Sequence, residues 1–94
     1  MTVRLFNYEN VTLKVTQDGT HCWVEGLDGE PWAKLSVDAI YLPKAPIGCF
    51  WLKTWSENRN ITASMAARGI LQLVGEPYAV SQWVAAVAAK VVPE

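Results

Sequence analysis

The sequence is poor in the residues that build catalytic and metal sites, because its 94 residues include one histidine and two cysteines. Structural zinc sites need four ligands and use closely spaced cysteines or histidines, a pattern that Cys22 and Cys49 do not form. His21 and Cys22 are adjacent, so on a strand their side chains point to opposite faces and cannot act as a nucleophilic pair. We therefore predict no metal, no cofactor and no catalytic residue, and favour a non-enzymatic protein.

The sequence also lacks long apolar runs. Arg4, Asn7 and Glu9 interrupt the N-terminal segment, unlike the apolar core of a secretion signal. No uninterrupted apolar run approaches the roughly 20 residues that cross a bilayer. We expect a cytoplasmic protein in which Cys22 and Cys49 are reduced, buried and unreactive, with a disulfide between neighbouring strands as the alternative.

Net charge is small and unevenly distributed. Eight basic and nine acidic residues give −1, which argues against generic binding to a nucleic-acid backbone. Residues 1–43 carry three basic and six acidic side chains, a net charge of −3, whereas residues 44–94 carry five and three, a net charge of +2. The densest acidic run is Glu25, Asp28, Glu30 and Asp38. Its carboxylates are either solvated turn residues or a surface that docks on a basic groove of a partner.

What the chain does contain is apolar residues, 51% of the total, which suffice for one domain over residues 1–94 with a single core. Alternation of apolar and polar side chains predicts early strands at residues 2–8, 10–17, 20–26 and 32–37. Asp18-Gly19 predicts a hairpin between the second and third of these strands. Two prolines between residues 38 and 48 favour a loop there.

Residues 49–55 are expected to form the central strand. Its alternate side chains make two sets, Phe50, Leu52 and Thr54 on one face and Cys49, Trp51, Lys53 and Trp55 on the other. Ser56 is a candidate N-cap for a helix over residues 57–68, and Gly69 is placed to end it.

The C-terminal third predicts a strand at residues 70–74, a break at residues 75–77 and a second helix. The second helix is predicted from five apolar residues whose spacing would place them on one helical face: Val80, Trp83, Val84, Val87 and Val91. For residues 78–82 the sequence pattern is compatible with either a strand or a helix. The predicted fold class is α+β, an antiparallel sheet of five or six strands with two helices packed on one face.

Two segments carry a resemblance to a known family. Gly29-Glu-Pro-Trp-Ala-Lys-Leu-Ser-Val37 and Phe50-Trp-Leu-Lys-Thr-Trp-Ser-Glu-Asn58 resemble small uncharacterised accessory proteins of plasmids, phages and other mobile elements. The similarity covers about residues 27–69, and the C-terminal third departs from the family's pattern. The resemblance implies a context, an accessory gene of a mobile element acting in the cytoplasm of a bacterial host. This class includes inhibitors of host defence such as anti-CRISPR proteins.

Five tryptophans are far more than a chain of this length usually has. If Phe50 and Leu52 face the helices, the other face carries Trp51, Lys53 and Trp55, joined by Trp23, Trp32 and Lys34 if the registers match. An exposed apolar patch of this kind marks a partner surface, and tryptophan is common at interface hot spots. The alternatives are closure of the patch by the C-terminal helix through Trp83, an ordinary core, or stacking of single-stranded nucleic acid.

The sequence therefore favours a non-enzymatic inhibitor that occupies a surface on a protein partner, such as a subunit of a CRISPR or restriction complex, without contacting nucleic acid or membrane. In this hypothesis the carboxylates attract a basic surface of the partner and so speed docking. The side chains of Trp32, Trp51 and Trp55 hold the partner at the interface. The predicted partner-binding residues are Glu25, Asp28, Glu30, Trp32, Asp38, Trp51, Lys53 and Trp55. The alternative is a structural module whose tryptophan-bearing sheet face makes a homodimer. An enzyme with a polar pocket around His21 is the third interpretation.

Overall fold

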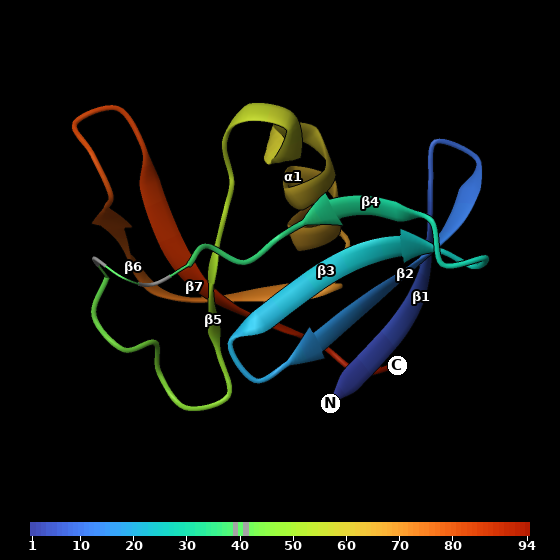
Figure 1. Ribbon diagram of the computed structural model, residues 1–94, viewed down its shortest axis with the longest axis horizontal. Helices are drawn as coiled ribbons and strands as arrows, with labels where there is room; N and C mark the ends of the chain where they lie inside the picture. Colours follow the sequence, from blue (N-terminus) through green and yellow to red (C-terminus); the bar gives the residue numbers. More distant parts are fainter. Residues whose placement is uncertain (39, 41) are drawn as a thin grey trace.

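The computed structural model describes residues 1–38, 40 and 42–94. The elements are β1 (Thr2–Tyr8), β2 (Val11–Asp18), β3 (His21–Gly26), β4 (Pro31–Lys34), β5 (Phe50–Leu52), the 3-10 helix η1 (Ser56–Asn58), α1 (Arg59–Ala67), β6 (Leu71–Ala79) and β7 (Ala85–Val91). The strands form two antiparallel sheets, in the orders β1-β2-β3-β4 and β5-β7-β6 (Figure 1). The described chain is mostly β, so the predicted α+β sheet of five or six strands under two helices is wrong.

The first sheet follows the alternation of its sequence. Strands β1, β2 and β3 confirm the predictions for residues 2–8, 10–17 and 20–26 to within one residue at each end. Leu13 and Val15 of β2 are fully buried on the core face. Asp18 still pairs with His21, so the predicted hairpin turns on Gly19 and Thr20, with Gly19 at φ +60°. Glycine adopts this left-handed conformation without strain.

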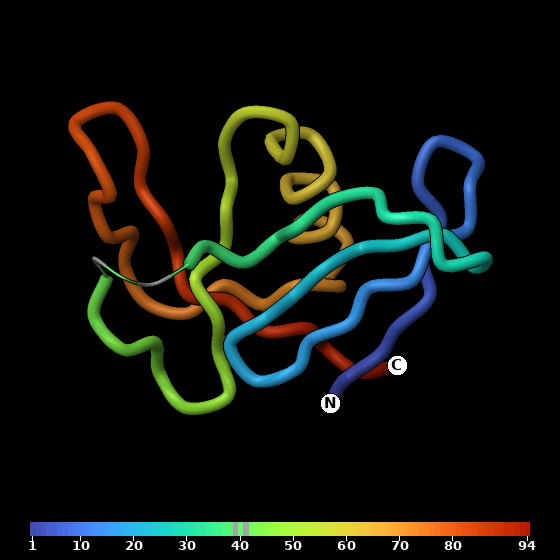
Figure 2. Tube along the Cα trace, in the orientation of Figure 1, coloured from blue at the N-terminus to red at the C-terminus, as the bar shows by residue number. Residues whose placement is uncertain are grey.

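The segment after β4 joins the two sheets. Ser36 forms a bridge to Leu52, the Val37 N–H donates to the Trp51 carbonyl at 2.9 Å, and the Lys53 N–H donates to the Leu35 carbonyl at 2.7 Å. Figure 2 shows this segment crossing beside β5 on its way out of the first sheet. The predicted strand at residues 32–37 thus divides its pairing between β3 and β5.

The core lies between the two sheets and α1. Its largest fully buried side chains include Phe50 and Leu52 from β5 and Met65 from α1. The helix ends as predicted, because Gly69 has φ +74° and the Ile70 N–H donates to the Met65 carbonyl at 2.9 Å, which is a Schellman ending. Its start differs from the prediction. Ser56 lies inside η1 at φ +59°, Trp55 occupies the N-cap position of η1, and Asn58 occupies that of α1.

The predicted C-terminal helix is wrong. Residues 85–91 are β7, the central strand of the second sheet, and Ala86, Val87, Ala88 and Ala89 are all buried. A strand that is covered on both faces is apolar throughout and shows no alternation, so its sequence cannot be told from a buried helix by periodicity. Strand β6 continues to Ala79 past an irregularity between Val74 and Tyr78, which places Tyr78 and Ala79 in a strand.

Both cysteine side chains are buried and are not joined in a disulfide, as the sequence predicted. In the part of the chain that the structure describes, no helix is long and apolar enough to cross a membrane.

Candidate functional site

Trp51, the predicted central anchor, lies inside the molecule. Its side chain is 8% exposed, and its Nε1 donates a hydrogen bond to the Pro43 carbonyl at 2.7 Å. The ring packs with Cys49, Ala86 and Ala88, and its centroid lies 5.9 Å from that of Tyr78. The expectation that Trp51 lies on an open sheet face is wrong, because Tyr78 and residues of the loop before β5, Leu42 and Ala45, pack over that face.

Trp55 and Lys53 are both partly buried. Trp55 is half-buried and packs against the cluster around Trp51. The Lys53 Nζ lies 2.8 Å from the Glu57 carboxylate, and this hydrogen bond lowers the pKa of Glu57. Of the three predicted anchors, only Trp32 is exposed, at 41%.

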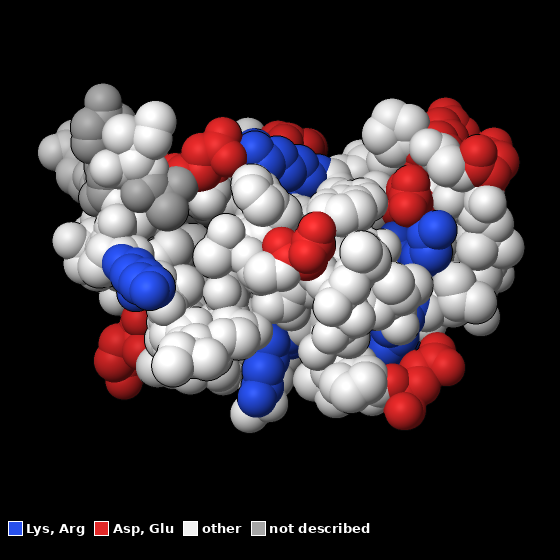
Figure 3. Space-filling view, turned by 60° about the horizontal axis from the view of Figure 1, so that its bottom comes forward, with Lys and Arg blue, Asp and Glu red and all other residues white. Residues whose placement is uncertain are grey.

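The predicted acidic run is not one patch. Glu25 pairs with Lys14 at 3.3 Å, and Asp38 pairs with Lys34 at 2.8 Å. The hydrogen bond from Lys34, together with its charge, lowers the pKa of Asp38. Figure 3 shows a face on which acidic and basic side chains are scattered over a largely uncharged surface, with no broad region of one sign.

Asp28 and Glu30 remain as the carboxylates of the run without an ion-pair partner among the described residues. Both lie in the turn between β3 and β4, where the Asp28 carboxylate accepts a hydrogen bond from the Glu30 N–H at 3.1 Å. This turn leads directly into the strand that carries Trp32.

The open aromatic face of the molecule is the outer face of the first sheet. The strand registers align side chains across it in rows, one formed by Val3, Thr16, Trp23 and Lys34 and the next by Leu5, Lys14 and Glu25. Trp32 lies on the same face, two residues from Lys34. Val3 and Leu5 are 50% and 48% exposed, respectively.

Thr16 shows how Trp23 lies on this face. Although Thr16 points away from the core, it is only 3% exposed. Its neighbours across the sheet are Val3 and Trp23, so their side chains cover it. Trp23 is therefore fixed against the sheet, whereas Trp32 projects from it.

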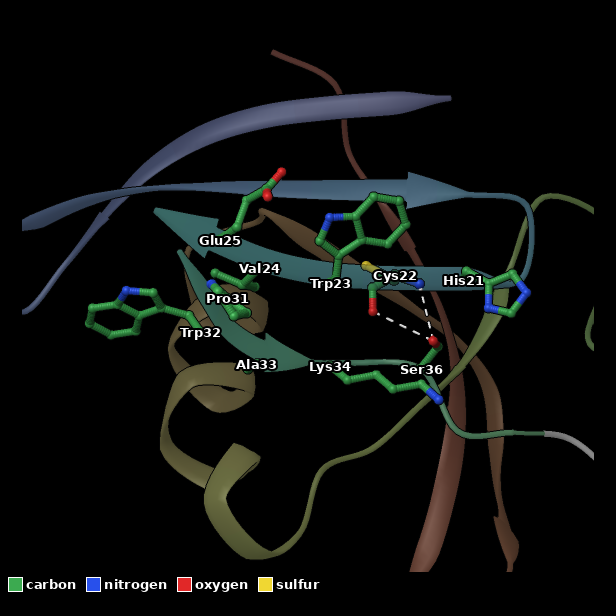
Figure 4. Close-up of a pocket in the computed structure, with 10 residues that line it drawn as sticks. All are labelled: His21, Cys22, Trp23, Val24, Glu25, Pro31, Trp32, Ala33, Lys34 and Ser36. Carbon is green, nitrogen blue, oxygen red and sulfur yellow. Dashed lines mark hydrogen bonds between the residues drawn. The ribbon is translucent and has the colours of Figure 1, made fainter. Parts of the chain in front are cut away.

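A shallow groove of about 480 Å³ runs over β3 and β4 on this face. Its lining is mostly apolar, and the charged groups in it are Glu25 and Lys34. Figure 4 shows Trp32 at one end and His21 at the other, with Trp23 between them. We call the outer-face residues Val3, Leu5, Trp23 and Trp32 the aromatic face.

The groove holds no activated nucleophile in the described residues. The Cys22 thiol lies beneath the sheet, and burial raises its pKa to about 12, the opposite of the lowered pKa of reactive cysteines. Within residues 1–38, 40 and 42–94, no three His, Cys, Asp or Glu side chains are grouped to hold a metal ion. What the groove offers is apolar surface with a few charged groups.

Sequence reasoning missed part of this face. It named Trp23 only on the condition that registers match, and it gave no role to Val3 and Leu5. The signal was present, since Val3, Leu5 and Asn7 alternate with Arg4, Phe6 and Tyr8, and Phe6 is the buried member.

The fold and this surface define a small two-sheet β protein with an open aromatic face. Comparison of the chain with protein-family models, with curated proteins and with solved structures found no match. The motif resemblance of residues 27–69 to mobile-element accessory proteins stays a prediction.

Proposed function

We propose that this protein is a non-enzymatic binding module that docks on another protein through its aromatic face. The observation that carries the proposal is the exposure of Val3 and Leu5 on β1 and of Trp32 on β4, at 50%, 48% and 41%, on one sheet face, with Trp23 of β3 between these outer strands. Exposed apolar patches mark interaction surfaces, and aromatic anchors with a polar rim are typical of them. The sheet beneath holds the anchors rigid, which lowers the entropy lost on binding.

A protein partner fits this face better than nucleic acid does. Stacking of single strands requires a positively charged groove that follows the phosphates. The lysines of the face, Lys14 and Lys34, each lie in an ion pair with a carboxylate. The cations that would neutralise phosphates are thus already engaged.

The partner we propose is a subunit of a host-defence complex, CRISPR or restriction, which the protein would inhibit by occupying its surface. Support for this identity comes from the motif resemblance, and support for the charge preference comes from Asp28 and Glu30. These two carboxylates lie in the turn that leads into Trp32, where they would favour a partner with a basic rim.

The test is quantitative binding of purified defence-complex subunits to the wild-type protein and to Trp32→Ala. A tryptophan at an interface hot spot is typically worth about 2 kcal/mol or more, so the variant should bind about 30-fold more weakly. Trp83→Ala is the matched control, because Trp83 is 84% exposed but lies in the β6–β7 hairpin, away from the aromatic face.

Equal binding by wild type and Trp32→Ala would remove the aromatic face from the proposal. Absence of binding by every CRISPR and restriction subunit would remove the inhibitory role. Unfolding curves of both variants confirm that the differences report binding rather than loss of fold.

A further inference from the structure

The groove over β3 and β4 is a recess of about 480 Å³ in the aromatic face. Trp23 of β3 and Trp32 of β4 both line it, and Figure 4 shows the Pro31 ring between the two indoles. Strand residues advance by about 3.3 Å, so the lining stretch from His21 to Glu25 makes the groove roughly 13 Å long. A shallow recess of this length accommodates an extended segment of a few residues.

The two indole N–H groups of the groove are open to a ligand. The Nε1 of Trp51 donates to the Pro43 carbonyl, whereas the Nε1 of Trp23 and that of Trp32 have no hydrogen-bond partner among the described residues. In Figure 4 the nitrogen of the Trp23 ring lies on the side toward the Trp32 end of the groove. An indole nitrogen is a donor only, so these groups recognise acceptors such as carbonyl oxygens.

A groove that offers apolar surface and donors favours a ligand rich in proline. A proline residue has a carbonyl acceptor but no N–H, so packing it on an apolar floor leaves no backbone donor unpaired. Proline-rich segments also adopt the extended polyproline II helix before they bind, and therefore lose little conformational entropy. At about 3.1 Å per residue, roughly four residues of such a helix span the groove.

The two ends of the groove differ in charge. At the Trp32 end, the turn between β3 and β4 carries Asp28 and Glu30, which are exposed and have no ion-pair partner in the described part of the chain. At the other end, Lys34 pairs with Asp38 at 2.8 Å, so these two charges cancel. A basic side chain of the ligand is therefore favoured beside Trp32, where an arginine can also stack on the indole.

We propose that the groove binds a proline-rich segment of a protein partner in the polyproline II conformation, with a basic residue at the Trp32 end. The proline rings pack on Trp23, Pro31 and Trp32, and the indole N–H groups donate to carbonyls of the ligand. This inference rests on the proposed docking role of the aromatic face, and it names the kind of partner segment that the face accepts.

Titration of isotope-labelled protein with synthetic peptides tests the proposal, because NMR resolves the indole N–H signal of each tryptophan. The probe is a peptide of about ten residues, with proline at two of every three positions and one terminal arginine, made in versions with the arginine at either end. The matched peptide has alanine in place of every proline. The proline peptide should shift the signals of Trp23 and Trp32 but not those of Trp51 and Trp83. It should bind at least about tenfold more tightly than the alanine peptide.

Two variants separate the contributions of the indole donor and of the acidic turn. Trp32→Phe keeps an aromatic ring but removes an N–H, and should weaken binding of the proline peptide about fivefold. Asp28→Asn/Glu30→Gln should weaken binding about threefold, and should have no effect on a peptide with glutamine in place of the arginine. Trp83→Phe is the matched control and should bind as the wild type does, because Trp83 lies in the β6–β7 hairpin.

Three results would overturn the proposal. The first is equal affinity for the proline and alanine peptides, or shifts at Trp83 without shifts at Trp32. The second is tighter binding of a single-stranded pyrimidine oligonucleotide than of the proline peptide, which would assign the groove to nucleic acid. The third is a change of the Trp23 and Trp32 signals with protein concentration alone, which would assign the groove to a second copy of the chain.

Failure of this inference is distinguishable from failure of the proposed function. If defence-complex subunits bind the wild-type protein and the proline peptide does not compete with them, the preference for proline is wrong and the docking role stands. If the proline peptide binds and every subunit fails to bind, the inhibitory role is wrong and the assignment of the groove stands.

Discussion

Gln17 connects three segments that are far apart in the sequence. Its Nε2 donates to the carbonyls of Gly19 at 3.1 Å and Gly48 at 2.8 Å, and its Oε1 accepts from the Val91 N–H at 2.8 Å. The side chain is 7% exposed. One amide thus joins the β2–β3 turn, the loop before β5 and the end of β7, and it does so by using both its donor and its acceptor.

Gln17→Leu should therefore lower the free energy of unfolding by about 2 kcal/mol, because it leaves the Val91 N–H buried without a partner. Urea denaturation measures this loss. Gln82→Leu is the control, since Gln82 is exposed, and it should change stability by less than about 0.5 kcal/mol. A Gln17→Leu variant as stable as the control would contradict the structural role of this amide.

The Cys22 thiol makes stability depend on pH in the alkaline range. Its folded-state pKa, about 12, lies above the ordinary value of 9.0 because burial penalises the thiolate. Above about pH 9 the unfolded chain loses a proton that the folded protein keeps, so the free energy of unfolding falls as pH rises.

Denaturation from about pH 9 to about pH 11 should show this decline in the wild type and a smaller one in Cys22→Ala, which has no thiol to ionise. The variant is less stable at neutral pH because a small cavity remains, so the slope rather than the absolute value is compared. Equal slopes in the two proteins would show that Cys22 ionises as freely in the folded state as in the unfolded one.

At the scale of elements, the sequence correctly predicted the strands and the helix end that depend on patterns of adjacent residues. The first three strands alternate clearly, and Gly69 marks the helix end, because turn and cap geometry are properties of a few adjacent residues. The prediction of a C-terminal helix was wrong because the structure of that segment depends on contacts with distant residues. Alanine favours helices in isolation, but β7 lies between β5 and β6, and this tertiary position overrides the propensity.

The small side chains of β7 are required by what packs on them. Ala88 pairs with Trp51 across the sheet and is 2% exposed. Ala88→Leu should lower the free energy of unfolding by about 1–3 kcal/mol, because the added atoms displace the indole. Thermal and urea unfolding report the change.

Ala67→Leu in α1 is the matched control, since Ala67 is exposed and should accept leucine with little effect. If residues 80–91 were the helix that the sequence predicted, its apolar stripe would run through Val80, Trp83, Val84, Val87 and Val91 and would not include position 88. An Ala88→Leu variant as stable as the control would therefore argue against β7.

At the scale of the whole molecule, the sequence predicted one sheet whose open face carries Trp51 and Trp55, joined by Trp23 and Trp32 if the registers match, whereas the structure divides Trp51 from Trp23 and Trp32 between two sheets. Alternation around Trp51 correctly separated its side chain from Phe50 and Leu52. It could not show which face is covered, because the cover comes from Tyr78, which is distant in sequence, and from the loop at Pro43, which folds back over β5. Trp32 was assigned to the exposed set and is exposed.

The acidic run of the sequence likewise does not form one surface patch in the fold. The pairing of β2 with β3 brings Lys14 to Glu25, whereas Asp38 pairs with Lys34, four residues before it in the chain. A charge pattern read along the chain gives the sum of charges but not their pairing. The proposed docking surface consequently rests on apolar exposure first, with Asp28 and Glu30 as its flanking charges.

The central claim is that the first sheet presents an open aromatic face while the tryptophan of β5 is enclosed. Hydroxyl-radical footprinting with mass spectrometry measures the oxidation rate of each tryptophan in the native protein and tests it directly. The structure predicts fast oxidation of Trp83 and Trp32, which are 84% and 41% exposed, and strong protection of Trp51, which is 8% exposed. Oxidation of Trp51 as fast as that of Trp32 would contradict the account, since the two faces would then be equally open.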